Sequence, residues 1–157
     1  MIRVRAEFGV EGGLIDFAEL EAATGLVSTR RRVWECKPPH YPVGSESWTI
    51  ERFMTSDAPA GSVVPDLMEW LEPMQRLLEE LGDLIKEYRQ DHGLSGYFKI
   101  VVNSEDGRMP LFRLSPGFLA LIERLDLWIA FDFYLWLGEE WAERERAEWK
   151  HQQAQIT

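Results

Sequence analysis

Apolar and charged residues alternate at the start of the chain. Apolar side chains stand at every second position from Ile2 to Val10, and Arg3, Arg5 and Glu7 stand between them. A two-residue period is typical of a strand with one buried face. Similar patterns, bounded by Gly, Pro and Asp, predict five further strands. They cover residues 30–36, 48–54, 97–103, 111–114 and 127–136.

Between these strands, apolar residues recur at three- and four-residue steps, which predicts amphipathic helices. The strongest such pattern runs from Leu67 to Tyr88 and stops at Gly93. Pro73 lies inside it and predicts a kink or a break, because proline has no N–H and clashes with the preceding turn. Shorter helices are expected over residues 16–25, 115–125 and 139–153. We expect Leu77, Leu81, Leu84, Phe131 and Phe133 to share one core.

The predicted order is β-α-β-β-α-β-β-α-β-α, and a chain of 157 residues is the usual size of one domain. This pattern predicts an α+β fold: a mixed or antiparallel sheet with its helices packed on one face. We place the domain at residues 1–137. Residues 138–157 are expected to form a charged helix and a tail appended to it.

The last predicted strand separates into two faces. Leu127, Ile129, Phe131, Phe133 and Leu135 form the expected core face. The other face carries large rings, one carboxylate and one phenol, which are residue types that anchor interfaces and ligand sites. The candidate binding residues are therefore Trp128, Asp132, Tyr134 and Trp136, with Trp48 or Arg52 nearby.

Two structural explanations compete with binding on this outward face. Trp141 and Trp149 of the final predicted helix would cover the rings if that helix acted as a lid. Alternatively, Asp132 would pair with an arginine, Arg3 or Arg5, on the outward side of the first strand. Aromatic rings at strand spacing are more often packed than functional, so both explanations stay open at this point.

Four segments together resemble a bacterial family known as domain of unknown function 4279. They are FAELEAATGLVSTRRRVW, ESWTIE, LLEELGDLIKEY and LFRLSPGFLALIERLDLWIAFDFY. They are similar to an early helix leading into the second strand, a tryptophan strand, a leucine-rich helix and a serine-led helix before a strand with an embedded Asp. The resemblance covers roughly residues 4–136. It implies no catalytic residue, and it implies a role in toxin-immunity gene neighbourhoods by analogy alone.

The sequence contains no phosphate-binding glycine motif and no nucleophile elbow. Its three histidines, His40, His92 and His151, have no metal-ligand spacing, so neither a metal nor another cofactor is expected. Cys36 shares a strand face with Trp34, which indicates a buried, inert thiol. An enzyme is therefore less expected than a binding protein.

The formal charge of −10 disfavours nucleic acid, whose phosphates repel such a surface, and favours a basic protein partner. A single cysteine, no apolar leader and no long apolar run predict a cytoplasmic protein without a membrane span. We expect an immunity-type protein that neutralises a partner toxin by binding it. The alternatives are an enzyme with a site near Asp132 and Tyr134, and a structural or assembly protein acting as a homo-oligomer, such as a homodimer.

Overall fold

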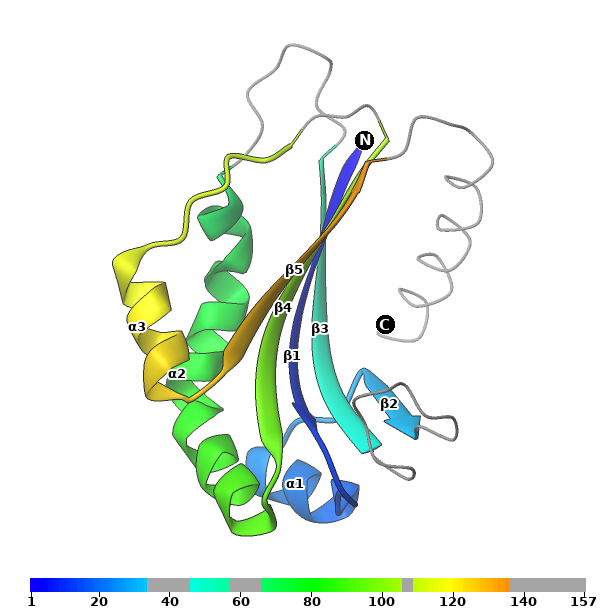
Figure 1. Cartoon of the computed structure of the whole chain (residues 1–157), viewed down its shortest axis with the longest axis vertical. Helices are drawn as coiled ribbons and strands as arrows, with labels where there is room; N and C mark the ends of the chain where they lie inside the picture. The colour runs from blue at the N-terminus through cyan, green and yellow to red at the C-terminus, as the bar shows by residue number, and fades with distance from the viewer. Residues whose placement is uncertain (34–45, 57–65, 106–108, 136–157) are drawn as a thin grey trace.

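The computed structural model describes residues 1–33, 46–56, 66–105 and 109–135 (Figure 1). Trp136 and the predicted helix over residues 139–153 lie outside this range, as does the end of the second predicted strand. The elements, in chain order, are β1 (Ile2–Glu11), α1 (Phe17–Thr24), β2 (Arg30–Val33), β3 (Glu46–Ser56), α2 (Leu67–His92), β4 (Ser95–Ser104), α3 (Pro116–Arg124) and β5 (Trp128–Leu135).

The strands form one mixed sheet in the order β2-β3-β1-β4-β5. The central strand β1 pairs antiparallel with β3 and β4, and β2 pairs antiparallel with β3. Only β4 and β5 are parallel neighbours, and α3 supplies the crossover that a parallel pair requires. This architecture confirms the predicted α+β class.

The helices α2 and α3 lie on one face of the sheet, and α1 lies near its lower end (Figure 1). The apolar positions of β1 all point toward α2 and α3 and are buried; they are Ile2, Val4, Ala6, Phe8 and Val10. They belong to one core with the buried residues of both helices. The alternation that predicted the first strand therefore also identified the inner face of the sheet.

Local capping signals set the helix ends as the sequence predicts. The side chain of Asp16 accepts a hydrogen bond from the backbone N–H of Glu19, and Gly25 ends α1 with a φ of 69°. The hydroxyl of Ser115 likewise accepts from the backbone N–H of Phe118 at the start of α3. Each cap satisfies a backbone group that the helix itself leaves unpaired.

The predicted break at Pro73 is wrong, because the helix α2 continues through this residue. Because proline has no N–H, the backbone carbonyl of Glu69 loses the hydrogen bond that residue 73 would donate. Both residues lie near the start of the helix and on its exposed side, so water can reach that carbonyl. The expected strand at residues 111–114 is reduced to a single bridge between Leu111 and Asp66.

The buried stripe of α2 is also rotated from the one expected. Leu84 is exposed, and Leu77 and Leu81 are only partly buried at the edge of the core. The fully buried positions are Leu67, Leu71, Met74, Leu78 and Ile85. Gly82 lies on this buried stripe, where a Cβ would stand 2.5 Å from the side chain of Leu125, the residue that follows α3.

Phe131 packs against the core as expected, whereas Phe133 at the far end of β5 is 45% exposed. The core is centred on the middle of the sheet, and β5 is its last strand in the described residues. The two phenylalanines share a face but not an environment, because the helices cover only part of this strand.

Candidate binding face of the sheet

The sheet has a second face, opposite α2 and α3, which we call the polar face. Among the described residues, no helix covers it. Trp128, Asp132 and Tyr134 of β5 lie on this face, as the alternation predicts. Trp128 is 44% exposed and Tyr134 is 41% exposed. Three of the candidate binding residues are thus brought together on one strand.

Trp48 and Arg52 of β3 lie on the opposite face from these three residues. Trp48 pairs with Val10 and is fully buried in the core, and Arg52 pairs with Ala6. The strand alternation of β3 alone does not tell which of its faces meets the helices. The pairing with β1 decides it, so the expectation that Trp48 or Arg52 would lie near Asp132 is wrong.

A hollow of about 340 Å³ occupies the polar face. It is lined by Arg5, Glu7, Glu11, Arg30, Ser47, Tyr97, Lys99, Trp128, Asp132 and Tyr134. Seven of these ten residues were not among the sequence candidates. The outward charges of β1 were visible in its alternation, but the strand order that gathers them beside β5 was not.

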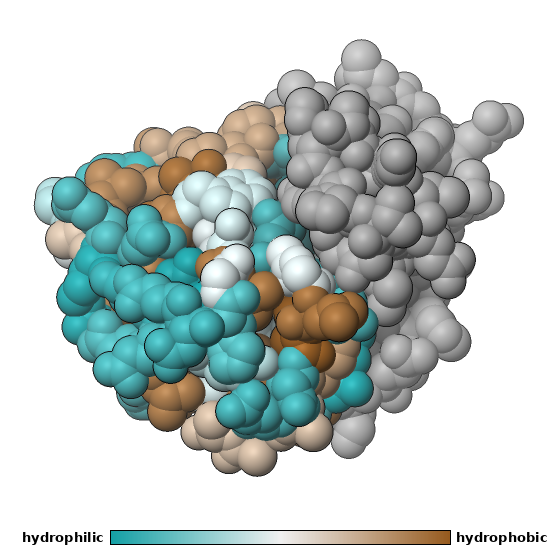
Figure 2. All heavy atoms as spheres, turned by 60° about the horizontal axis from the view of Figure 1, so that its bottom comes forward, coloured by the Kyte–Doolittle hydropathy of each residue, from teal (hydrophilic) through white to brown (hydrophobic). Residues whose placement is uncertain are grey.

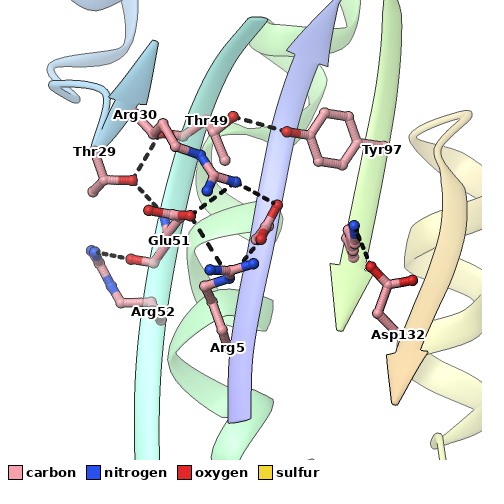
Figure 3. A network of polar contacts seen from close by, with 10 residues as sticks. Arg5, Thr29, Arg30, Thr49, Glu51, Arg52, Tyr97 and Asp132 are labelled. Atoms are coloured by element: carbon pink, nitrogen blue, oxygen red, sulfur yellow. Dashed lines mark hydrogen bonds and ion pairs between the residues drawn. The ribbon is translucent and has the colours of Figure 1, made fainter. Parts of the chain in front are cut away.

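Tyr97 forms the floor of this hollow. Its ring lies across Gly9 of β1, where a Cβ would stand 2.3 Å from the ring atom Cζ. Its hydroxyl reaches Thr49 of β3, with 2.8 Å between the two hydroxyl oxygens (Figure 3). Burial raises the pKa of Tyr97 to about 12. The glycine therefore lets one phenol of β4 bridge across the central strand.

The exposed ring of Trp128 rests on this phenol. The centroids of Tyr97 and Trp128 lie 5.1 Å apart, and the ring planes differ by 29°. Stacked rings at this separation attract one another beyond their burial of area. Trp128 is consequently supported from beneath while one side of it faces solvent.

Two arginines and two glutamates form a compact charge network next to Tyr97 (Figure 3). Nε of Arg5 lies 2.6 Å from Oε1 of Glu7. Nη2 of Arg30 lies 3.2 Å from Oε2 of Glu7 and 3.2 Å from Oε1 of Glu51. Both carboxylates are buried. These carboxylates can be buried because each is paired with the positive charge of an arginine.

Asp132 pairs with Lys99 of the neighbouring strand, and Nζ lies 2.5 Å from Oδ2 (Figure 3). The alternative explanation, in which Asp132 pairs with an arginine of β1, is wrong. Arg3 contacts Glu105 instead, and Arg5 contacts Glu7. The reason is the strand order: β4 lies between β1 and β5.

The charges that line the hollow balance, with three basic residues against three acidic ones. The pKa of the Tyr97 phenol is raised by burial, the opposite of the lowered pKa that activates a tyrosine as a base or nucleophile. Within the described residues, no group of three His, Cys, Asp or Glu could hold a metal ion. The arrangement therefore offers aromatic contact and hydrogen bonds.

No helix in the described part of the chain is long and apolar enough to cross a membrane.

A comparison of the chain with models of known families, with curated proteins and with solved structures found no match. The resemblance to the family of domain of unknown function 4279 thus stays a prediction.

Proposed function

We propose that this protein acts by binding a partner protein through its polar face, with Trp128 and Tyr134 as the anchoring rings. The observation that carries the proposal is the state of Trp128. This residue is 44% exposed, yet its ring is stacked on a buried tyrosine. An exposed aromatic ring on a rigid support is the feature that dominates the energetics of many protein interfaces.

The support beneath Trp128 favours binding for an entropic reason. Tyr97 is held by its contact with Gly9 and by its hydrogen bond to Thr49. A ring that is already ordered loses little freedom when a partner covers it, so more of the contact energy appears as affinity. The same support rests on paired strands rather than on a loop.

The partner that fits this surface is basic overall. The chain carries a formal charge of −10, which attracts a basic partner and speeds the encounter. The hollow itself is balanced in charge, so it supports specificity through fixed geometry. A lysine or arginine approaching Asp132 would compete with Lys99 for its carboxylate.

Figure 2 shows mostly hydrophilic residues over the lower end of the described part, with small separate hydrophobic patches. The helix α2 and its cap carry eight acidic residues against four basic or imidazole side chains. The acidic residues are Asp66, Glu69, Glu72, Glu79, Glu80, Asp83, Glu87 and Asp91, and the others are Arg76, Lys86, Arg89 and His92.

In this proposal the acidic residues of α2 attract a basic partner at long range, and the polar face supplies the anchoring rings. An immunity-type role against a basic toxin is the specific form of binding that we propose.

The direct test begins with the full chain immobilised and exposed to a bacterial lysate, followed by purification of the protein it captures. Binding of that purified protein is then measured for the wild type and for Trp128→Ala, Tyr134→Ala and Val27→Ala. Val27 is 74% exposed and lies between α1 and β2, so it is a matched apolar control. We expect Trp128→Ala to weaken binding about 30-fold, the effect of an anchoring residue worth about 2 kcal/mol.

Circular dichroism and thermal unfolding of each variant distinguish lost binding from lost structure. The proposal requires that Val27→Ala binds as the wild type does, while both ring variants stay folded and bind less. If the folded Trp128→Ala and Tyr134→Ala proteins bind as tightly as the wild type, the polar face is not the recognition surface.

A further inference from the structure

The strand β5 is one edge of the sheet in the described part of the chain, where it pairs with β4 alone (Figure 1). An edge strand presents a row of backbone N–H and C=O groups that can pair with another chain. The other edge of the described sheet is β2, whose described residues include three successive arginines, Arg30, Arg31 and Arg32. Clustered positive charge protects that edge against pairing.

The edge strand β5 lacks this protection. Its described residues, Trp128–Leu135, have the sequence WIAFDFYL, with no lysine, arginine, proline or glycine. Its one charged residue, Asp132, is paired with Lys99 inside the same chain. Charge therefore does not oppose the approach of a second strand along most of this edge.

Exposed rings stand on both faces of β5. Trp128 and Tyr134 lie on the polar face, and Phe133 lies on the face toward the helices. Phe112 packs edge-to-face on Phe131 and Phe133, with centroids 4.9 and 5.4 Å away, and is itself partly exposed. The apolar surface thus wraps around the edge from one face of the sheet to the other.

From these features we propose that a second copy of this chain pairs with β5, antiparallel and about a two-fold axis normal to the sheet. Such an axis keeps the helix side of both copies together. Each residue must then face a residue of the second copy whose side chain points to the same side of the sheet. Only pairings centred on a single residue of β5 meet this condition.

The pairing centred on Phe131 is the best of these. It places Trp128 opposite Tyr134 of the second copy, Ile129 opposite Phe133, and Ala130 opposite Asp132. Aromatic pairs and aromatic–β-branched pairs directly across two strands are favourable. The single carboxylate faces a small methyl group, so no like charges meet.

The pairings centred on the two residues next to Phe131 are less favourable. A pairing centred on Asp132 sets the two aspartates directly opposite each other, which is destabilising. A pairing centred on Ala130 sets Asp132 against the ring of Trp128 and leaves Phe133 and Tyr134 beyond the paired segment of the second copy. The sequence of β5 is therefore self-complementary in one register.

This dimer would complete the hollow on the polar face. Trp128 lines the hollow, and the pairing brings Tyr134 of the second copy beside it. Two hollows would then lie on one continuous polar face, related by the two-fold axis. The dimer does not depend on the proposed partner, since it needs only the purified chain.

Sedimentation of the purified full chain over a range of concentrations tests the dimer. We expect the wild type to dimerise and Phe133→Lys to weaken dimerisation at least tenfold, because a lysine there faces Ile129 of the second copy. Leu14→Lys, at an exposed position near α1, is the matched control and should leave the dimer intact. Circular dichroism confirms that both variants fold. A wild type that stays monomeric at all concentrations would overturn the proposal.

Cysteine cross-linking tests the register, in a chain whose own thiol is removed by Cys36→Ser. An equal mixture of Ala130→Cys and Asp132→Cys proteins should form a disulfide-linked dimer, because these positions face each other. Either protein alone should not, since its two cysteines would stand on diagonal positions roughly 7–8 Å apart. Cross-linking of one variant alone, without the mixed product, would overturn the Phe131-centred pairing.

Failure of this inference and failure of the proposed function are distinguishable. If the wild type is monomeric and Trp128→Ala still abolishes partner binding, the binding face is supported and the dimer is rejected. If the wild type dimerises and the folded Trp128→Ala variant binds the partner normally, the edge pairing is supported and the binding face is rejected.

Discussion

Gly9 lies directly beneath the ring of Tyr97, so closely that a Cβ at residue 9 would stand 2.3 Å from the ring atom Cζ. Tyr97 is buried, and its hydroxyl is held by Thr49 on the far side of β1. The ring therefore cannot swing away freely. One missing side chain on the central strand sets the position of the phenol that supports Trp128.

We predict that Gly9→Ala destabilises the protein by about 1–3 kcal/mol, the usual cost of overpacking a tight site. Chemical denaturation measures the free energy of unfolding. Gly117→Ala is the matched control, because nothing lies within 4 Å of a Cβ built there and the residue is in α3. That change should be neutral or stabilising by up to about 1 kcal/mol. Equal effects of the two substitutions would contradict the close approach at Gly9.

Stability should fall at alkaline pH because of Tyr97. Its pKa is raised from 10.0 to about 12 in the folded protein. Between these values the unfolded chain loses the phenolic proton while the folded protein keeps it, so the unfolded state is favoured as pH rises. The stabilisation is complete below pH 10 and is lost toward pH 12. Its full size is about 2–3 kcal/mol for a shift of two units.

The measurement is the free energy of unfolding between pH 9 and 11, for the wild type and for Tyr97→Phe. Tyr97→Phe removes the titrating phenol and should have a shallower decline with pH, although it is less stable at neutral pH through loss of the contact with Thr49. Parallel curves for the two proteins would show that Tyr97 does not titrate as described.

The charge network on the polar face predicts a large effect of a nearly isosteric change. Glu7→Gln removes one carboxylate and leaves Arg5 and Arg30 with Glu51 alone. Breaking a buried ion pair on one side typically costs about 3–5 kcal/mol, and the partial exposure of both arginines reduces this to about 3 kcal/mol. Glu72→Gln, in an exposed pair with Arg76, should cost less than about 1 kcal/mol. Thermal unfolding of both variants checks the difference, which must be clear if the network is buried.

The orientation of α2 predicts unequal effects of three leucines. Leu78→Ala should cost about 2–5 kcal/mol, because Leu78 is fully buried and the change leaves a cavity. Leu81→Ala should destabilise the protein less, since Leu81 is only partly buried. Leu84→Ala should destabilise it least, since Leu84 is exposed. Urea denaturation gives the three values. The reverse order would mean that α2 presents a different stripe to the sheet.

Local sequence patterns predict which side chains of each strand share a face and where the described helices begin and end. These properties depend on residues that are close in the chain. The two-residue period of β1 and β5 separates apolar from polar side chains wherever the strands lie. Asp16 and Ser115 cap helices through backbone groups three residues away. The fold class followed from the same local patterns.

How these faces meet depends on contacts between strands that are distant in the chain. Strand order and register join residues far apart in the chain, and no local period encodes them. Strand order and register place Trp48 in the core and Trp128 outside it. They also paired Asp132 with Lys99, because β4 separates β5 from the arginines of β1. The stacking of Trp128 on Tyr97 requires β1, β4 and β5 side by side, which is why the pattern of any single strand could not predict it.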